Sequence, residues 1–228
     1  MIVIKSRRLR SILKIVIPFI LIPLAVFFGA KLLDARKHML VSLAVALLTI
    51  CLFVAGFEKK QTGTRRMVII SIMIALSIVG RFIPFFKPVT AITIITAIYL
   101  GGESGFMVGA FSALLSNFSF GQGPWTPFQM LSWGMLGLIA GFLAKPLKAN
   151  KVFLLIFGVI SGIIFSIIMD VWIVLSYNDV LNVQLFFSSF IAAIPHTVLY
   201  SISNFVFLLI LSKPFGEKLE RIKVKYGV

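Results

Sequence analysis

The stretch from Ser104 to Ala144 constrains the fold of this chain most, because its 41 residues include no Asp, Glu, Lys or Arg. An α-helix rises about 1.5 Å per residue and the apolar core of a bilayer is about 30 Å thick, so about 20 residues cross it once. The stretch is therefore long enough for two crossings. Its middle, Gly121-Gln-Gly-Pro-Trp-Thr-Pro127, holds glycines and prolines, where helix propensity collapses. We predict two membrane helices joined by a turn at this point.

The composition of the whole chain indicates an integral membrane protein. Of its 228 residues, 60% are hydrophobic and only 13% are charged, whereas soluble domains carry about 25% charged residues. The other long apolar runs cover residues 11–30, 39–57, 67–82, 88–100, 152–175 and 183–212. Together with the pair above they predict an all-α polytopic fold with about eight crossings. Cys51 is the single cysteine, so no disulfide can form within the chain.

The distribution of positive charge predicts the orientation of the chain in the membrane. The net charge of +15 sits in short segments between the apolar runs, which is the positive-inside pattern and not the folded basic surface that nucleic acid would need. The segments 5–10, 58–66, 145–151 and 213–228 hold 16 of the 22 Lys and Arg, against five in the loops 31–38, 81–87, 121–126 and 177–182. We therefore predict a protein of the bacterial cell membrane with both termini in the cytoplasm. We predict that the basic tail forms a short amphipathic helix on the membrane surface.

The polar segment 58–66 is the best candidate for a boundary in the chain. It predicts an N-terminal transmembrane hairpin in residues 1–60 and a six-helix core in residues 61–228. The first core helix carries small residues four apart at Ser71 and Ala75. Such a shallow face lets another helix approach closely, so it suits a partner protein.

Uncharged hydrogen-bonding groups and aromatic rings gather around the central turn, which is unusual in lipid. Gln122, Trp125 and Gln129 offer two amides and an indole, and they indicate a surface that recognises a polar, flat or bulky solute. Asn117 and Trp133 lie further along the two helices and would deepen such a site. The alternative for the first three is interfacial anchoring by the tryptophan with a capped turn. For the other two it is interhelical bonding or packing.

Two ionisable residues lie within the later apolar runs. Asp170, close to Trp172, is the only acidic residue deep in such a run. An ionisable group at that depth is costly and by default suggests a functional site, although an ion pair with Arg81 or Lys87 is the structural alternative. His196 follows a proline, so its ring has two possible partners, the solute or the backbone carbonyl that the proline leaves free.

Five segments of the sequence resemble the substrate-binding S components of energy-coupling factor (ECF) transporters. The segment Thr64–Arg81 resembles the opening helix of these proteins, and the segments 101–110, 120–129, 169–172 and 218–227 are similar to the same group. The resemblance covers residues 60–228, the six-helix core typical of S components, and leaves the hairpin as an addition. The run Gly-Gln-Gly-Pro-Trp looks like the cobalamin-type subgroup.

The resemblance implies a subunit that captures a vitamin-like solute at the outer face of the membrane. It implies docking on a shared membrane subunit driven by two ATP-binding cassette ATPases, followed by reorientation to release the solute inside. Cobalamin or a related corrinoid is the implied solute, with another small vitamin or cofactor precursor as the alternative. Ser71 and Ala75 match in size the paired alanines with which the family docks. No nucleotide-binding loop occurs in this sequence, so ATP would be used by the partner chains and no cofactor is expected here.

Two other classes of protein fit the sequence less well. An intramembrane enzyme needs a metal-ligand cluster, a carboxylate pair or a nucleophile with its base. The two histidines, His38 and His196, lie on different segments, and neither His-Glu-x-x-His nor Gly-x-Ser-x-Gly occurs. We therefore predict no catalytic or metal-binding residue. A self-sufficient secondary transporter normally has several intramembrane acids and an internal repeat, and this sequence has one such acid and no repeat.

Overall fold

The computed structural model describes residues 6–32, 38–56, 60–177 and 182–226, and all the regular structure within them is helical. The N-terminal part consists of α1 (Arg7–Val16), a π-helical turn η1 (Ile17–Leu21), α2 (Ile22–Leu32) and α3 (His38–Ala55). The core consists of α4 (Lys60–Gly80), α5 (Val89–Leu100), α6 (Gly102–Phe120), α7 (Thr126–Phe142), the short α8 (Ala144–Ala149), α9 (Lys151–Tyr177) and α10 (Val183–Tyr226). Each predicted apolar run thus contains a helix.

Four helical stretches of the described chain are long and apolar enough to cross a membrane. They are Arg7–Ala30, His38–Ala55, Lys151–Tyr177 and Val183–Tyr226. The protein is therefore a multi-pass membrane protein. The further crossings by α4 to α7 stay predictions, since α5, for example, has only 12 residues.

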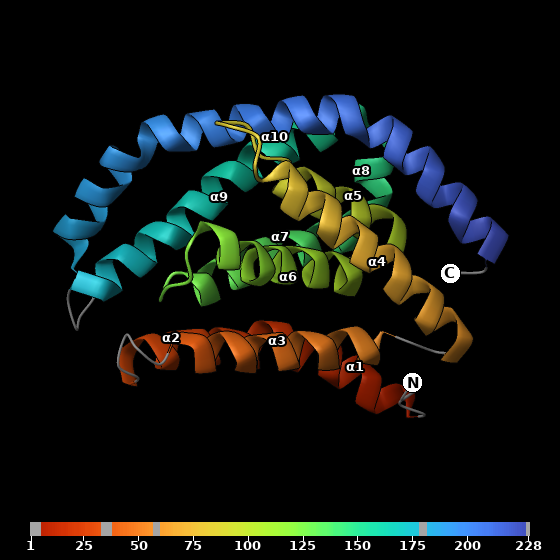
Figure 1. Cartoon of the computed structure of the whole chain (residues 1–228), viewed down its shortest axis with the longest axis horizontal. Coiled ribbons are helices and arrows are strands. Elements are labelled where there is room, and N and C mark those ends of the chain that lie inside the picture. Colours follow the sequence, from red (N-terminus) through yellow and green to blue (C-terminus); the bar gives the residue numbers. More distant parts are fainter. Residues whose placement is uncertain (1–5, 33–37, 57–59, 178–181, 227–228) are drawn as a thin grey trace.

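The tail is helical as predicted, but it is not a separate short helix, because it continues α10 as part of one helix of 44 residues. Its place on the membrane surface stays a prediction. This helix contains Pro195 and Pro214 and arches over α9 (Figure 1). Prolines within a helix bend it where neighbouring helices support the freed backbone groups. The tail also packs on the core, because Leu219 is 3% exposed and a guanidinium nitrogen of Arg65 donates to the carbonyl of Tyr226 at 2.6 Å.

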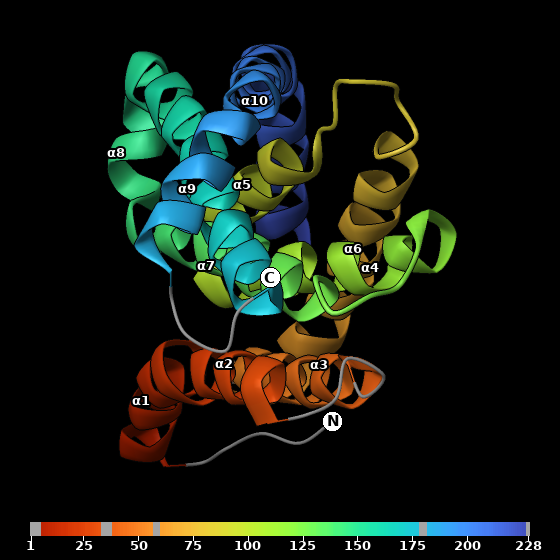
Figure 2. The ribbon, with the colours of Figure 1, turned by 90° about the vertical axis from the view of Figure 1, so that its left-hand side faces the viewer.

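The helices form layers in which the hairpin covers one side of the core. Figures 1 and 2 show α2 and α3 lying beneath α6 and α7, with α9 and α10 on the other side. Val45 and Leu52 of α3 are fully buried in a hydrophobic cluster that also contains Phe106 of α6 and Leu136 of α7. The hairpin is thus packed on the core by apolar contact.

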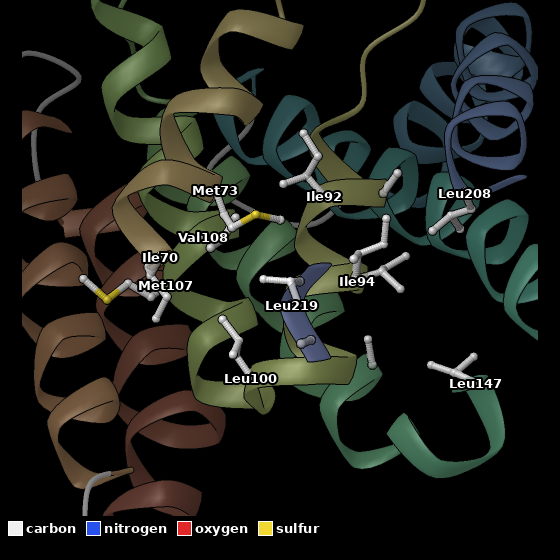
Figure 3. Close-up of a cluster of buried hydrophobic side chains, with 14 of the residues drawn as sticks. Ile70, Met73, Ile92, Ile94, Leu100, Met107, Val108, Leu147, Leu208 and Leu219 are labelled. Carbon is white, nitrogen blue, oxygen red and sulfur yellow. The ribbon is translucent and has the colours of Figure 1, made fainter. Parts of the chain in front are cut away.

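α5 lies at the centre of the core, which explains how so short a helix is accommodated. Ten of its 12 residues are buried. Figure 3 shows Ile92, Ile94 and Leu100 of this helix in a cluster with Met73 of α4 and Leu208 of α10. Burial by neighbouring helices thus accounts for a helix that is shorter than a full crossing.

α6 and α7 pack closely because glycines line their contact. A Cβ added at Gly109 would lie 2.5 Å from the carbonyl oxygen of Trp133, and one added at Gly105 would lie 3.0 Å from the carbonyl oxygen of Gly137. Neither position has room for a side chain, as expected where small residues bring helix backbones together. This contact fixes the backbone of Trp133 against α6.

The two ends of the bundle carry different connections. The α6–α7 turn, the end of α9 and the start of α10 lie at the left of Figure 1, whereas the start of α1 and the end of α10 lie at the right. The first and last helices therefore begin and end on one side of the bundle, and which side of the membrane this is stays a prediction. The predicted loops at 33–37 and 178–181, and residues 58 and 59 of the basic segment, lie outside the described residues.

Candidate functional site

A cavity of about 530 Å³ opens among α7, α9, α10 and the turn between α4 and α5. Arg81 and Lys87 of this turn line it, as do Gln129 of α7, Asp170 of α9 and His196 of α10. These positions are near the end of α4, the start of α7, the end of α9 and the first half of α10. The cavity therefore lies toward the end of the bundle opposite the terminal segments. Its volume is typical of sites for small molecules, which span about 300–1,000 Å³.

Aromatic rings form a continuous wall of this cavity. Trp133 stacks on Phe165 with ring centroids 4.9 Å apart and planes 19° apart. Phe165 contacts Tyr200 at 4.9 Å, and His196 stacks on Tyr200 at 6.0 Å and 15°. Flat aromatic faces favour a ligand that is itself flat and aromatic.

Hydrogen bonds hold Tyr200 in this wall. The indole N–H of Trp133 donates to the Tyr200 hydroxyl at 2.5 Å, and the same hydroxyl shares a 2.6 Å hydrogen bond with Thr90 of α5. All three side chains are at least 95% buried. Buried polar groups with partners rigidify a site, whereas an unpartnered one would be costly.

A second polar network joins the α4–α5 turn to α6 and α7. The guanidinium of Arg81 donates to the Ser116 hydroxyl and, at 2.7 Å, to the amide oxygen of Asn117. The Asn117 amide nitrogen donates to Thr126 and to the side-chain oxygen of Gln129, both at 2.8 Å. Asn117 does not line the cavity itself. Its hydrogen bonds orient Arg81 and Gln129, which do.

The charges in the cavity are not paired with one another. Asp170 is 2% exposed and its Oδ2 atom has no hydrogen-bond partner. Among the described residues, no cation lies within 4.0 Å of this carboxylate, so the ion pair with Arg81 or Lys87 considered above is not formed. Burial, and then the nearby Arg81 charge, lower the pKa of Lys87.

A second hollow of about 530 Å³ lies between α9 and α10. Its only polar side chains are Thr197 and Ser201, whose hydroxyls donate to the carbonyls of Ala193 and Val159. No polar group is left to orient a solute, so the surface suits lipid chains. The first cavity, with its charges and amides, is the candidate site.

The eight predicted solute-binding residues separate into two groups. Gln129, Trp133, Asp170 and His196 line the cavity, and Asn117 supports it from behind. The remaining three, Gln122, Trp125 and Trp172, are not among its lining residues.

Those three side chains hold the α6–α7 turn together. The Gln122 amide donates to the carbonyl of Leu114 at 2.8 Å and accepts from the Thr126 hydroxyl at 3.0 Å. Trp125 contacts Trp172 edge to face at 5.8 Å. The contacts of Gln122 are those of the capped turn that the sequence left as the alternative for Gln122 and Trp125. Solute binding by these three residues stays a prediction.

Sequence reasoning missed Tyr200 and Phe165 as site residues. Tyr200 follows His196 by four positions, so one face of a helix carries both, and this spacing was a usable signal. Phe165 is one of 23 phenylalanines, and nothing in the sequence distinguishes it. The sequence indicated Arg81 and Lys87 only as loop charges and as possible ion-pair partners of Asp170, not as residues of the site.

The small residues on α4 face away from the core. Ser71 and Ala75 are exposed, beside Val68 and Val79 at 58% and 68% exposure. The Ser71 hydroxyl donates to the carbonyl of Met67 at 3.0 Å, so it adds no unsatisfied polar group to the surface. We call these four exposed residues the α4 face.

Residues 61–221 match the protein family described as the ECF-type riboflavin transporter, S component. The chain belongs to this family. No curated protein and no solved structure shows significant similarity to it. The predicted ECF S component is thus confirmed, whereas the matched family is the riboflavin type and not the cobalamin type. An S component is the substrate-binding membrane subunit of a vitamin transporter and not an enzyme, and members of the family work with a shared membrane subunit and ATPases.

Proposed function

We propose that this S component captures riboflavin, or a closely similar flat heteroaromatic vitamin, in the cavity described above. The observation that carries the proposal is the family match, which covers α5 to α9 entirely and α4 and α10 in large part. The aromatic wall of Trp133, Phe165 and Tyr200 supports it, since aromatic side chains favour contact with a flat tricyclic ring.

The size of the cavity favours such a vitamin over a corrinoid. A volume of about 530 Å³ suits a ligand of ordinary drug size. Cobalamin, the solute implied by the Gly-Gln-Gly-Pro-Trp run, is a far larger macrocycle with a nucleotide tail. The residues of that run stabilise the turn beside the cavity and do not line the cavity. Their contacts therefore give no evidence for cobalamin or for any other solute.

We further propose that uptake requires partner chains. The α4 face, with Ser71 and Ala75, would dock on the shared membrane subunit, and two ATP-binding cassette ATPases would supply the energy. With the cytoplasmic termini predicted from the charge distribution, the cavity would open to the outside. A secondary transporter is less favoured, because Asp170 is the only buried carboxylate among the described residues, whereas such carriers normally have several intramembrane acids.

Binding to the purified protein tests the solute directly. Riboflavin is expected to bind with quenching of its fluorescence by the aromatic wall and to raise the unfolding temperature, because a ligand of the native state stabilises it. Cobalamin at the same concentration is expected to do neither. Stabilisation by cobalamin alone would contradict the proposed solute.

Two glutamines of the same turn region locate the site. Gln129→Ala should weaken riboflavin binding by roughly 10-fold, the loss of one well-placed hydrogen bond. Gln122→Ala is the matched control, since Gln122 bonds within the turn and does not line the cavity. An equal or greater loss in the Gln122 variant would move the site to the turn.

A further inference from the structure

Two cations in the candidate site have no counter-ion in the described chain. Four carboxylates are described, and three of them pair elsewhere: Glu103 with Lys14, Glu220 with Lys148 and Glu217 with Arg221. The fourth, Asp170, lies within 4.0 Å of no described cation. Arg81 and Lys87 therefore line the cavity with an excess of positive charge over its single carboxylate.

The surroundings of these cations are apolar or neutral. The Arg81 guanidinium lies 4.9 Å from the ring centroid of Phe120 and 5.2 Å from that of Trp133. The Lys87 ammonium lies 5.6 Å from the Phe120 ring. Arg81 is 8% exposed, and its Nε atom has no hydrogen-bond partner. Cation–π contacts stabilise a charge less well than an anion does, so burying Arg81 with the partly buried Lys87 in the same cavity is costly without an anion.

We propose that the solute of this cavity carries an anionic group, a phosphate monoester or a carboxylate, which Arg81 and Lys87 hold. The proposal rests on the proposed function, since it concerns the same cavity, and it narrows the substrate to an acidic derivative of the aromatic vitamin. Arg81 is held by Ser116 and Asn117, so its charge is already oriented before the solute arrives. A preorganised cation loses little entropy on binding an anion.

The carboxylate of Asp170 completes the specificity of the site. Its free Oδ2 atom accepts hydrogen bonds, so it suits a solute N–H or O–H and repels an anion. Because Asp170 belongs to α9 and the cations belong to the α4–α5 turn, a bound solute would be oriented by both signs of charge. Its anionic group would lie at Arg81 and Lys87, its ring along the aromatic wall, and a donor group at Asp170.

Lys87 is the better residue to substitute in a test. Its backbone N–H donates to the Ser203 hydroxyl at 2.8 Å and its carbonyl accepts from the same hydroxyl at 3.2 Å, and both contacts survive a change of side chain. Arg81 supports Asn117 as well, so Arg81→Lys, which keeps the charge, serves as the second variant. Lys151→Met is the matched control, because Lys151 is exposed at the start of α9.

The experiment measures binding of riboflavin, of riboflavin 5′-phosphate and of a carboxylated flavin to the purified full chain. The wild type should bind one of the two acidic flavins at least as tightly as riboflavin. Whether this is the phosphate or the carboxylate identifies the anionic group. Lys87→Met should weaken binding of that acidic flavin by roughly 10- to 100-fold, which is the range of a charge-assisted hydrogen bond. Binding of riboflavin should weaken by less than about 3-fold. Arg81→Lys should retain a preference for the acidic flavin.

Two results would overturn the anion site. One is a wild type that prefers riboflavin to both acidic flavins by about tenfold or more, and the other is an equal loss for all three ligands in Lys87→Met. If no flavin binds, the proposed solute fails, and inorganic phosphate then tests the anion site by itself. Thermal stabilisation by phosphate in the wild type and in Lys151→Met, but not in Lys87→Met, would support the site. Equal stabilisation of all three proteins would overturn it.

Discussion

Lys14 of α1 forms an ion pair with Glu103 of α6, with Nζ 2.8 Å from Oε1. The pair joins the hairpin to the core at the end of the bundle where α4 begins. There, Arg66 of α4 donates to the Ser104 hydroxyl at 2.9 Å. Glu103 also lies close to the end of α3, because a Cβ added at Gly56 would be 3.6 Å from its carboxyl carbon. One carboxylate thus brings together the hairpin, α6 and the helix that carries the α4 face.

Removal of this charge should loosen the hairpin. Glu103→Gln is expected to destabilise the protein by about 1–2 kcal/mol, between the values of exposed and fully buried pairs, since the two side chains are 40% and 17% exposed. Thermal unfolding in detergent measures the change. In Lys14→Met the same Glu103→Gln change should cost less, because the pair is already lost. Glu217→Gln is the control, since its partner Arg221 is 4.0 Å away and 83% exposed. A similar loss of stability in Glu103→Gln and Glu217→Gln would show that the Lys14–Glu103 pair has no special role.

A bulky residue on the α4 face should separate docking from solute binding. Ala75→Trp is expected to reduce co-purification with the shared membrane subunit, since close helix approach needs small residues. Riboflavin binding by the isolated protein should stay within about twofold of the wild type. Ile160→Trp is the control, because Ile160 is 45% exposed on α9. Loss of binding and docking together in Ala75→Trp would assign the residue to the core.

The hydroxyl of Tyr200 should matter for both stability and binding. Tyr200→Phe leaves the Trp133 indole N–H and the Thr90 hydroxyl without their buried partner. The expected cost is about 1–3 kcal/mol, read from the unfolding temperature, with weaker riboflavin binding as the wall loses its order. Tyr177→Phe removes the same atom from a residue that is 77% exposed and should change neither property. An unchanged unfolding temperature in Tyr200→Phe would contradict the network.

Asn117 should act on the site from behind the cavity. Asn117→Leu keeps the branched shape of the side chain, although Leu is larger, and removes the acceptor for Arg81 and the donors to Thr126 and Gln129. We expect a loss of about 2 kcal/mol or more, because several buried groups lose a partner together. Riboflavin affinity should fall as well. Asn182→Leu is the comparison, since Asn182 is exposed and caps only the start of α10, a contact worth about 1 kcal/mol. Equal losses in the two variants would argue against the network.

The chain of apolar runs predicted the helices well, because helix length and hydropathy are properties of one segment at a time. The central turn and the resemblance to S components came from such local patterns. The continuity of the tail helix with α10 was missed for the opposite reason. Contacts such as Leu219 in the core and Arg65 with Tyr226 keep the tail in line with α10, and no local pattern contains them.

The site was predicted only in part. Gln129 and Trp133 line the cavity, whereas Gln122 bonds to α6 and to Thr126, and Trp125 packs on Trp172 of α9. All four have the residue types of a binding surface, so composition cannot separate them. The conformation of the turn and the rotation of α7 about its axis determine which of these side chains point into the cavity.

What the sequence by itself determined is a helical membrane protein, because the bilayer demands long apolar helices whatever their neighbours. Only the tertiary structure decided which side chains meet. Arg81 reaches Asn117, Trp133 reaches Tyr200, and Asp170 reaches none of the described cations. These relationships join residues from different helices. They depend on how the helices pack and rotate against one another. Contacts between distant segments determine this packing, and the hydropathy of single segments does not reveal it.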